Sequence, residues 1–174
     1  MAKPRYKRVV VKVSGEALLG SESYGLHAPT LSRVAADLVE TSKLGVEIAV
    51  VIGGGNLVRG AMLAETGIDR ATADAMGMLG TVMNALAIED AIKKQGVSVR
   101  TMSALPMPSV CEQYSHQRGI RHLSAGHIVV LAGGIGNPYF TTDTTAALRA
   151  AELGCEAILK ATNVDGVYDS DPKQ

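Results

Sequence analysis

The sequence is organised around the stretch Ile48-Ala49-Val50-Val51-Ile52-Gly53-Gly54-Gly55-Asn56-Leu57-Val58-Arg59-Gly60. The run 48–52 is apolar at every position, which predicts a strand covered on both faces, as in a parallel sheet flanked by helices. Three adjacent glycines remove every Cβ at the end of that strand, so backbone N–H groups can surround an anion there. Arg59 adds a planar set of donors that matches phosphate oxygens. The stretch therefore predicts a phosphate-binding turn at the carboxyl end of a strand, although a tight turn that merely needs glycine leaves the same pattern.

Composition predicts one globular domain and disfavours a role in binding nucleic acids. The 174 residues are 47% hydrophobic and include 19 glycines, as expected for an α/β domain with a real core. Lys+Arg and Asp+Glu number 17 each, so no overall positive field attracts a phosphodiester backbone. Five Tyr, one Phe and no Trp leave few rings on which bases could stack.

Cysteine usage and the lack of long apolar runs predict a soluble, cytoplasmic protein. Cys111 and Cys155 are isolated in the sequence, so neither a disulfide framework nor a Cys-x-x-Cys metal site is indicated. The start is basic, but Lys12 interrupts the apolar run that follows, which argues against a signal peptide. We expect no stretch long enough to span a bilayer.

Strand and helix patterns alternate along the chain. We expect strands at 9–13, 46–52, 97–102, 127–132 and 157–160, with helices at 29–44, 72–95 and 111–124 and an alanine-rich helix that follows 141–143 and ends at Leu153. A short helical piece should follow Arg59, and Asp165-Gly166 suggests a hairpin turn. This alternation predicts an α/β fold whose mostly parallel central sheet has helices on both faces.

The long helix at 72–95 carries an apolar stripe and a carboxylate near its start. The stripe, made of Met76, Leu79, Met83, Leu86 and Ala87, recurs at helical spacing and is most simply core packing. Asp74 is most simply a carboxylate in the first turn that complements the helix N-terminus.

A second glycine turn and two lysines complete the candidate chemistry. The strand 127–132 runs into Gly133-Gly134-Ile135-Gly136 and then Thr141-Thr142-Asp143, which place hydroxyls and a carboxylate at a helix start, either as caps or as ligands of an anion. Lys12 and Lys160 each close an apolar strand, where an ammonium group must reach either water or an anion. We expect both glycine turns and the amine of Lys12 to converge on one pocket.

Several common devices are absent from the sequence. No Gly-x-x-x-x-Gly-Lys-Ser/Thr loop, no Gly-x-Gly-x-x-Gly fingerprint and no Gly-x-Ser-x-Gly elbow is present. The four histidines have no metal-ligand spacing, so we interpret His27, His116, His122 and His127 as surface or satisfied core residues. The remaining parts suit phosphoryl transfer, in which catalysis consists mainly of positioning and charge neutralisation.

Four motifs carry a specific resemblance. Lys12–Ala17, Gly53–Gly60, Gly136–Asp143 and Lys160–Tyr168 resemble, in order and over nearly the whole chain, the bacterial UMP kinases of the amino-acid kinase superfamily. The segment Gly136-Asn137-Pro138-Tyr139-Phe140-Thr141-Thr142-Asp143 is the most specific of them. The resemblance implies transfer of the ATP γ-phosphoryl group to UMP, giving UDP and ADP, as a step of pyrimidine nucleotide (CTP) synthesis.

The resemblance also implies roles for individual residues. The implied catalytic residues are Lys12, Asp143 and Lys160. The implied ATP site consists of Lys12, Ser14, Gly15, Gly55, Arg59, Thr162, Asn163, Tyr168 and Asp171. The implied UMP site consists of Gly54, Asp74, Ile135, Gly136, Asn137, Pro138, Tyr139, Phe140, Thr141 and Thr142, which gives Asp74 a ligand role in place of the helix-terminus role above. The stretch linked to activation by GTP corresponds to Gly20, Ser21, Glu22, Ser23, Tyr24 and Gly25. Magnesium would arrive with ATP, with Asp143 as its possible protein contact.

Assembly, regulation and chain length follow from the same resemblance. Such kinases are typically homohexamers that GTP activates and UTP inhibits. Their chains continue well past the position of Asp171-Pro172, so residues 1–174 are expected to be a single domain that lacks its C-terminal part and exposes apolar surface there. A related kinase acting on a carboxylate, or a catalytically silent nucleotide-binding module, are the alternatives.

Overall fold

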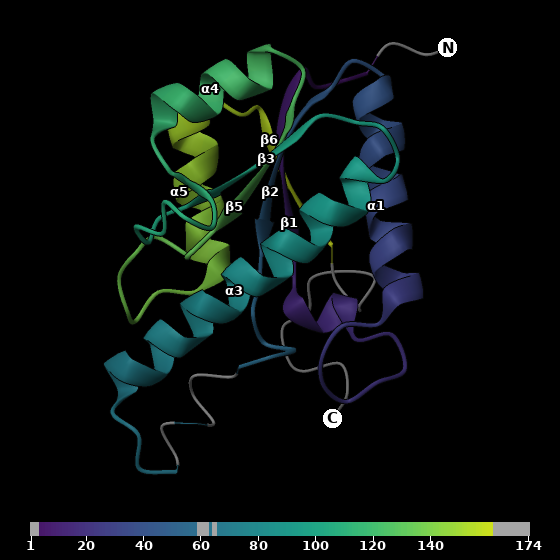
Figure 1. The fold of residues 1–174 in the computed structure, drawn as a ribbon. Helices are drawn as coiled ribbons and strands as arrows, with labels where there is room; N and C mark the ends of the chain where they lie inside the picture. Colours follow the sequence, from purple (N-terminus) through teal and green to yellow (C-terminus); the bar gives the residue numbers. More distant parts are fainter. Residues whose placement is uncertain (1–3, 59–62, 64–65, 162–174) are drawn as a thin grey trace, which may run out of the picture.

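The computed structural model describes residues 4–58, 63 and 66–161, and within them it forms one six-stranded sheet between two helical layers (Figure 1). The strands are β1 (Arg8–Val13), β2 (Glu47–Ile52), β3 (Val99–Ser103), β4 (Glu112–Gln113), β5 (Ile128–Ala132) and β6 (Ala157–Ala161). Their order is β4-β3-β5-β2-β1-β6, and every neighbouring pair is parallel. The predicted α/β fold class is confirmed. The short helical piece after Arg59 and the hairpin at Asp165-Gly166 fall outside the described residues.

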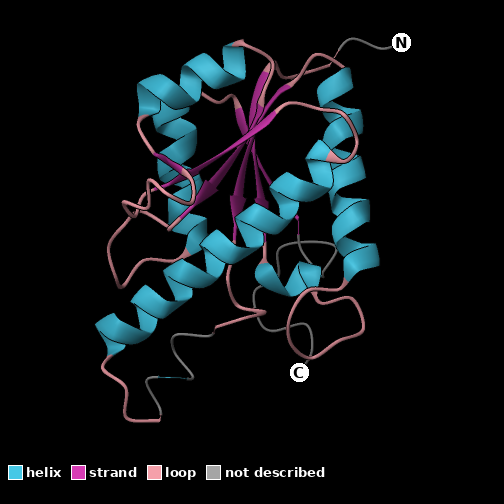
Figure 2. Ribbon diagram, viewed as in Figure 1, coloured by secondary structure: helices cyan, strands magenta, loops and turns pink. Residues whose placement is uncertain are grey.

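Helices cover both faces of the sheet, as the alternation predicts. They are the 3₁₀ helix η1 (Gly15–Leu18) and the α-helices α1 (Ala28–Lys43), α3 (Arg70–Lys93), α4 (His116–Ser124) and α5 (Thr142–Leu153). Helices α1 and α3 lie together on one face, and α4 and α5 lie on the other (Figures 1 and 2). The alanine-rich helix α5 begins after its cap Thr141 and ends at Gly154, whose left-handed φ of 64° a glycine adopts without strain.

The sheet separates the apolar core into two clusters. Ile48 and Val50 of β2 pack toward α1 and α3 with Ile88, whereas Val51 packs toward α4 and α5 with Leu153. Strands β2 and β5 are fully buried except for Glu47, because helices cover both of their faces. The edge strand β6 is different, since Ile158 and Leu159 are 46% and 47% exposed.

The prediction that the apolar stripe of α3 is core is wrong. Met76, Leu79, Met83 and Leu86 are between 37% and 57% exposed, and Ala87 is half-buried. The helix instead buries its small and branched residues, among them Gly80, Ala85 and Ile88. Both faces of α3 carry apolar residues, so periodicity alone could not identify the face that meets the sheet.

The same helix bears on the expectation that no segment is long enough to cross a bilayer. Among the described residues, α3 passes by length and composition, with a mean hydropathy of 1.2, and 39% of its apolar window is buried in the protein. The expectation is wrong on length and hydropathy. Long core helices of globular proteins have the same property, and α3 does pack on α1, β3 and β5.

The expected helix at 111–124 is shorter than predicted. Residues 112–113 form the edge strand β4, and α4 begins only after Ser115, whose hydroxyl accepts from the backbone N–H of Arg118. Gly119 is buried inside α4, where a Cβ would lie 2.7 Å from a methyl group of Leu153. That glycine therefore permits close packing of α4 on α5.

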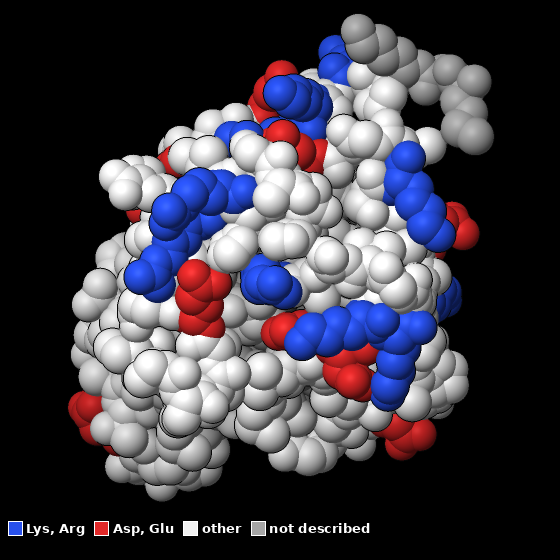
Figure 3. All heavy atoms as spheres, turned by 45° about the horizontal axis from the view of Figure 1, so that its top comes forward, with Lys and Arg blue, Asp and Glu red and all other residues white. Residues whose placement is uncertain are grey.

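Charged side chains of both signs are interspersed on the face shown in Figure 3. In the described part of the chain, several acidic and basic side chains form ion pairs, such as Arg8 with Glu47 at 2.5 Å. This face has no extended area of one sign, in keeping with the equal numbers of acidic and basic residues in the sequence.

Candidate active site

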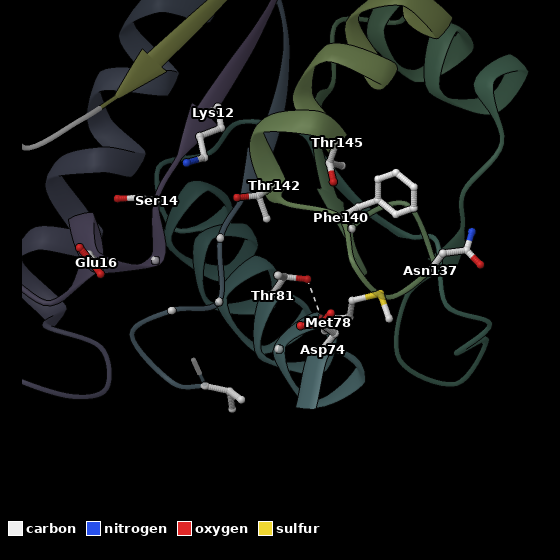
Figure 4. A pocket seen from close by; sticks show the side chains of 17 residues that line it. Lys12, Ser14, Glu16, Asp74, Met78, Thr81, Asn137, Phe140, Thr142 and Thr145 are labelled. Carbon is white, nitrogen blue, oxygen red and sulfur yellow. Dashed lines mark hydrogen bonds between the residues drawn. The ribbon is translucent and has the colours of Figure 1, made fainter. Parts of the chain in front are cut away.

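The two glycine turns and Lys12 open into one cleft at the carboxyl ends of the strands, as predicted. The cleft has a volume of about 500 Å³. It is lined by Lys12, Ser14, Gly15, Glu16, Gly53, Gly54, Gly55, Val58, Asp74, Gly77, Met78, Thr81, Gly134, Asn137, Phe140, Thr142 and Thr145. Figure 4 shows Lys12 and Ser14 on one side and Asn137 and Phe140 on the other, with Asp74, Met78 and Thr81 of α3 between them.

Lys12 and Lys160 are placed side by side by strand register. They are direct neighbours on the parallel strands β1 and β6, so their side chains leave the same face of the sheet. The Lys12 amine lies 3.0 Å from one carboxylate oxygen of Asp143, and the Lys160 amine lies 3.1 Å from the other. Lys12 is only 7% exposed, so of the two partners that the sequence left open for its amine, water or an anion, the structure provides an anion, the Asp143 carboxylate.

Asp143 lies in the first turn of α5, where the helix N-terminus favours a negative charge. Partial burial raises the pKa of its carboxyl, but hydrogen bonds and charge from Lys12 and Lys160 outweigh that effect and hold the pKa below its usual value. The carboxylate therefore stays ionised at neutral pH and keeps both amines oriented. Thr141, two residues earlier, caps the helix, because its hydroxyl accepts a hydrogen bond from the N–H of Thr144 at 3.2 Å.

The turn after β1 is fitted closely to the first glycine turn. Ser14 caps η1, with its hydroxyl accepting from the N–H of Ala17 at 3.2 Å. A Cβ on Gly15 would lie 2.5 Å from the Asn56 side-chain oxygen and 2.7 Å from the Gly55 nitrogen. Only glycine allows these two turns to touch, and the contact sets one wall of the cleft.

Gly54 packs directly on the backbone of α3. A Cβ there would lie 2.6 Å from the carbonyl oxygen of Gly77 and 2.9 Å from the nitrogen of Thr81. Gly80 gives α3 a bare surface that admits this turn, because a Cβ there would lie 3.4 Å from the carbonyl oxygen of Gly54 and 3.7 Å from its Cα.

The second glycine turn is held by α3 and α5. The N–H of Gly133 donates to the hydroxyl of Thr81 at 2.8 Å, and the carbonyl oxygen of Gly134 accepts from Arg149 at 3.3 Å. Gly133, Gly134 and Gly136 all have positive φ, between 57° and 87°, so their backbone conformations need glycine.

Asp74 clamps the loop that follows. Its carboxylate accepts from the backbone N–H of Tyr139 at 2.8 Å and from Arg70 at 2.9 Å. Burial raises the pKa of the Asp74 carboxyl, but the hydrogen bonds from the Tyr139 N–H and Arg70 and the charge of Arg70 together outweigh burial, so the pKa lies below its usual value. The interpretation of Asp74 as a first-turn charge is wrong, because α3 begins at Arg70 with Asp69 as its cap.

Other residues with implied roles lie outside the cleft lining. Ile135, Gly136, Pro138, Tyr139 and Thr141 belong to the loop that borders it. In the stretch Gly20–Gly25, Ser23 and Tyr24 line a second cavity of about 520 Å³, which adjoins the first glycine turn from behind at Gly55 and Asn56. Arg59, Thr162, Asn163, Tyr168 and Asp171 fall outside the described residues.

Several lining residues were not identified from the sequence. They are Gly77, Met78, Thr81 and Thr145, whereas Glu16, Gly53 and Val58 fall inside the motifs quoted above without individual roles. Glycines inside a helix were a usable signal for Gly77 and its neighbours, because they mark a close approach. Thr81 gave no local signal, since its partner Gly133 lies 52 residues away.

The cleft suits an anionic ligand. Among residues 4–58, 63 and 66–161, no three His, Cys, Asp or Glu side chains are grouped as metal ligands. The cleft instead combines glycine turns with the amine of Lys12; Asp143 and Lys160 are not among its lining residues, but Asp143 pairs with both Lys12 and Lys160 beside it. That donor set can hold and neutralise phosphate oxygens.

Comparisons with known proteins agree in sequence and in structure. The sequence profile of the amino acid kinase family matches residues 7–174. The uridylate kinase of Azorhizobium caulinodans is 64% identical over 168 residues, which are 97% of this chain and 71% of that protein. The uridylate kinase of Rhodopseudomonas palustris is 59% identical over 174 residues, 100% of this chain and 73% of that protein. The crystal structure of UMP kinase from Bacillus anthracis superposes with a TM-score of 0.92 at 41% identity, covering 97% of this chain and 70% of that one.

Proposed function

The chain belongs to the amino acid kinase family, and from that premise we infer that it transfers the γ-phosphoryl group of ATP to UMP, giving ADP and UDP. The observation that carries this reading is the shared cleft, in which both glycine turns meet Lys12. A transfer between two nucleotides needs two phosphate-binding elements that face one another, and the cleft has them.

We propose that the turns after β1 and β2 hold the donor. Lys12, Ser14, Gly15 and Gly55 would contact ATP phosphates, because all four line this end of the cleft and glycine turns allow close approach of an anion. The remaining residues of the proposed ATP site lie outside the described part of the chain; they are Arg59, Thr162, Asn163, Tyr168 and Asp171.

The acceptor would lie against α3 and the second glycine turn. The proposed UMP contacts are Gly54, Asp74, Ile135, Gly136, Asn137, Pro138, Tyr139, Phe140, Thr141 and Thr142. Asp74 is well placed to accept a hydrogen bond from a hydroxyl group of the acceptor, since its carboxylate is ionised and lines the cleft. Phe140 lines the same end with 56% of its surface exposed, which leaves its ring free to pack on a base.

The proposed chemistry depends on charge rather than on a general base. The attacking oxygen of UMP belongs to a phosphate and is already ionised near neutral pH. Lys12 and Lys160 would neutralise the three equatorial oxygens of the transferring group, and Asp143 would fix both amines in the direction of transfer.

We propose Mg²⁺ as the metal that accompanies ATP. When bound, it supplies additional neutralisation between the β- and γ-phosphates. The residues present fit that role, because Mg²⁺ is commonly held by one or two carboxylates together with substrate phosphates, and Asp143 offers one carboxylate beside Lys12.

We further propose that the protein forms a homohexamer in the cytoplasm, is activated by GTP and is inhibited by UTP. The exposed stripe of Met76, Leu79, Met83 and Leu86 supports assembly, because apolar side chains at this spacing form helix–helix contacts. The GTP effect would act through Gly20, Ser21, Glu22, Ser23, Tyr24 and Gly25, and the second cavity behind the glycine turn supports a site there. Residues 1–174 would form a single domain.

ADP release measured with alternative acceptors tests the reaction. UMP, CMP, AMP and an acyl amino acid are compared at equal concentration, and strict dependence on UMP is expected. Dependence on the acyl amino acid would assign a carboxylate kinase instead, and nucleotide binding without turnover would assign a silent module.

The role of Lys12 is tested by substitution. Lys12→Ala should lower kcat by about 10²–10³ while changing UMP affinity little, because its amine acts on the transferring group. Lys94→Ala is the matched control, since Lys94 is an exposed helix lysine paired only with Asp90, and it should keep the full rate. Equal loss of kcat and UMP affinity in Lys12→Ala would contradict the assignment.

A further inference from the structure

Two asparagines are buried behind the cleft, and the proposed chemistry uses neither side chain. Asn56 follows the first glycine turn and is 2% exposed, and Asn84 on α3 is fully buried. Their amides pair reciprocally: the Asn84 Nδ2 donates to the Asn56 Oδ1 at 2.6 Å, and the Asn56 Nδ2 donates to the Asn84 Oδ1 at 3.2 Å. Each amide thus acts as donor and acceptor to the other.

The pair also reaches two backbone segments. The Asn84 Nδ2 donates to the carbonyl oxygen of Gly53, and the Asn56 Nδ2 donates to the carbonyl oxygen of Gly25, both at 2.7 Å. A backbone hydrogen bond from the Gly25 N–H to the Asn56 carbonyl oxygen, 3.1 Å, strengthens the second link. The network therefore connects α3, the first glycine turn and the loop at 19–27.

The same pair supports the turn after β1. The Asn56 Oδ1 occupies the space beside Gly15, where a Cβ would approach it to 2.5 Å. Three segments that are distant in sequence, at Gly15, Gly25 and Gly53, therefore meet on two side chains.

Packing alone does not require such a pair. Buried amides are costly unless all their bonds are made, and apolar residues of similar volume fill a core without that demand. A fully satisfied network does something apolar packing cannot, since it fixes the relative position of the groups that it bonds.

We propose that Asn56 and Asn84 are positioning residues for the phosphate-binding turns and that they transmit the conformation of the loop at 19–27 to the first glycine turn. The proposal rests on the proposed function, because it assigns a regulatory path to that same site. A ligand that shifts the loop would move Gly25, and through Asn56 it would move the wall formed by Gly53 and Gly15. The donor phosphates would respond more than the acceptor, since the hydrogen bonds of the two asparagines reach Gly25 and Gly53, whereas most proposed UMP contacts lie in the second glycine turn and the loop after it.

The test uses Asn84→Ala in the full chain, with Val82→Ala as matched control. Val82 lies on the same helix, is 3% exposed and packs in the apolar core, and its side chain has no polar atom, so its truncation destabilises the fold without removing a hydrogen bond of the network. Asn84→Ser is measured in parallel as a milder substitution. Serine keeps a hydrogen-bonding hydroxyl, but its side chain is too short to reach both Asn56 and Gly53. Steady-state kinetics for ATP and UMP and hydrogen exchange of peptides from 19–27 are recorded at a temperature where each variant is folded.

We expect kcat/KM for ATP to fall between about tenfold and a hundredfold in Asn84→Ala, because small displacements of positioning groups are amplified in rate. The KM for UMP should change less than about twofold. Exchange in 19–27 should rise about tenfold, although Asn84 does not contact that loop, since loss of the pair frees Asn56. Val82→Ala should show neither effect.

Equal behaviour of Asn84→Ala and Val82→Ala in both measurements would overturn the proposal. A kinetic change without faster exchange at 19–27 would overturn the link to the loop. The exchange measurement needs no turnover, so failure of the proposed phosphoryl transfer would appear separately, as an inactive wild type whose loop still responds to Asn84→Ala.

Discussion

Gly54→Ala is the most direct test of how the cleft is built. The new methyl group would lie 2.6 Å from the Gly77 carbonyl oxygen, 2.9 Å from the Thr81 nitrogen and 3.1 Å from the Gly80 carbonyl carbon. All three atoms are backbone, so no side-chain rotation relieves the contact and either the turn or α3 must move. Overpacking of this kind costs about 1–3 kcal/mol.

That cost converts into a melting shift. For a chain of 174 residues, each kcal/mol corresponds to about 2–4 °C, so Gly54→Ala should melt roughly 2–12 °C lower. Gly77→Ala is the matched variant on the opposite surface, because its new methyl group would have only the Val58 carbonyl oxygen within 4.0 Å. It should gain about 0.5–1 kcal/mol of helix stability and melt roughly 1–4 °C higher.

The assay is thermal unfolding by circular dichroism, followed by kinetics of both variants. Gly54→Ala should also lower kcat/KM for UMP, because Gly54 is itself a proposed UMP contact. If Gly54→Ala melted with wild type, or Gly77→Ala melted below it, the close contact between turn and helix would not exist as described.

Three further predictions concern charge, assembly and thiol chemistry. The lowered pKa of Asp143 means that its stabilising effect is complete above about pH 4 and is lost as pH falls through the folded pKa, so urea titrations of wild type and Asp143→Asn should differ less as pH falls below about 4; a constant difference contradicts the ion pairs. Met83→Lys places a charge on the most exposed residue of the α3 stripe and should shift sedimentation toward smaller species, whereas Lys94→Met outside the stripe should not; unchanged assembly would remove the stripe from the interface. Burial raises the pKa of Cys155 to about 11, so iodoacetamide should label it slowly at pH 7 and rapidly in urea, and fast labelling of the folded protein would argue against its burial.

Most of the fold could be predicted from local sequence signals. The unbroken run 48–52 fixed a buried strand, and the sequence of alternating strands and helices predicted a parallel sheet that the structure contains. Lys12 and Lys160 were identified as anomalies in apolar strands. The sequence left two possible partners for Lys12, water or an anion. Only the folded structure decides between them, because Asp143 lies 131 residues after Lys12 in the sequence.

The errors have a common physical origin. The stripe on α3 was misread because the true inner face mixes apolar residues such as Ile88 with Gly80 and Thr81, so its hydrophobic signal does not exceed that of the exposed stripe. Asp74 was misread because the start of α3 lies two residues earlier than expected, at Arg70. The pair of Asn56 and Asn84 gave no signal at all, since a polar residue next to a turn or within a helix is usually exposed.

Helix α3 contacts the glycine turns of both halves of the cleft. Its backbone near Gly77 supports Gly54, and one helical turn further along the hydroxyl of Thr81 accepts a hydrogen bond from the N–H of Gly133. The distance between the two phosphate-binding turns is therefore set by one helix, and a shift of α3 along its axis moves both turns with it. A contact that another subunit makes with the outer side of α3 would therefore move both turns together and preserve the distance over which the phosphoryl group travels.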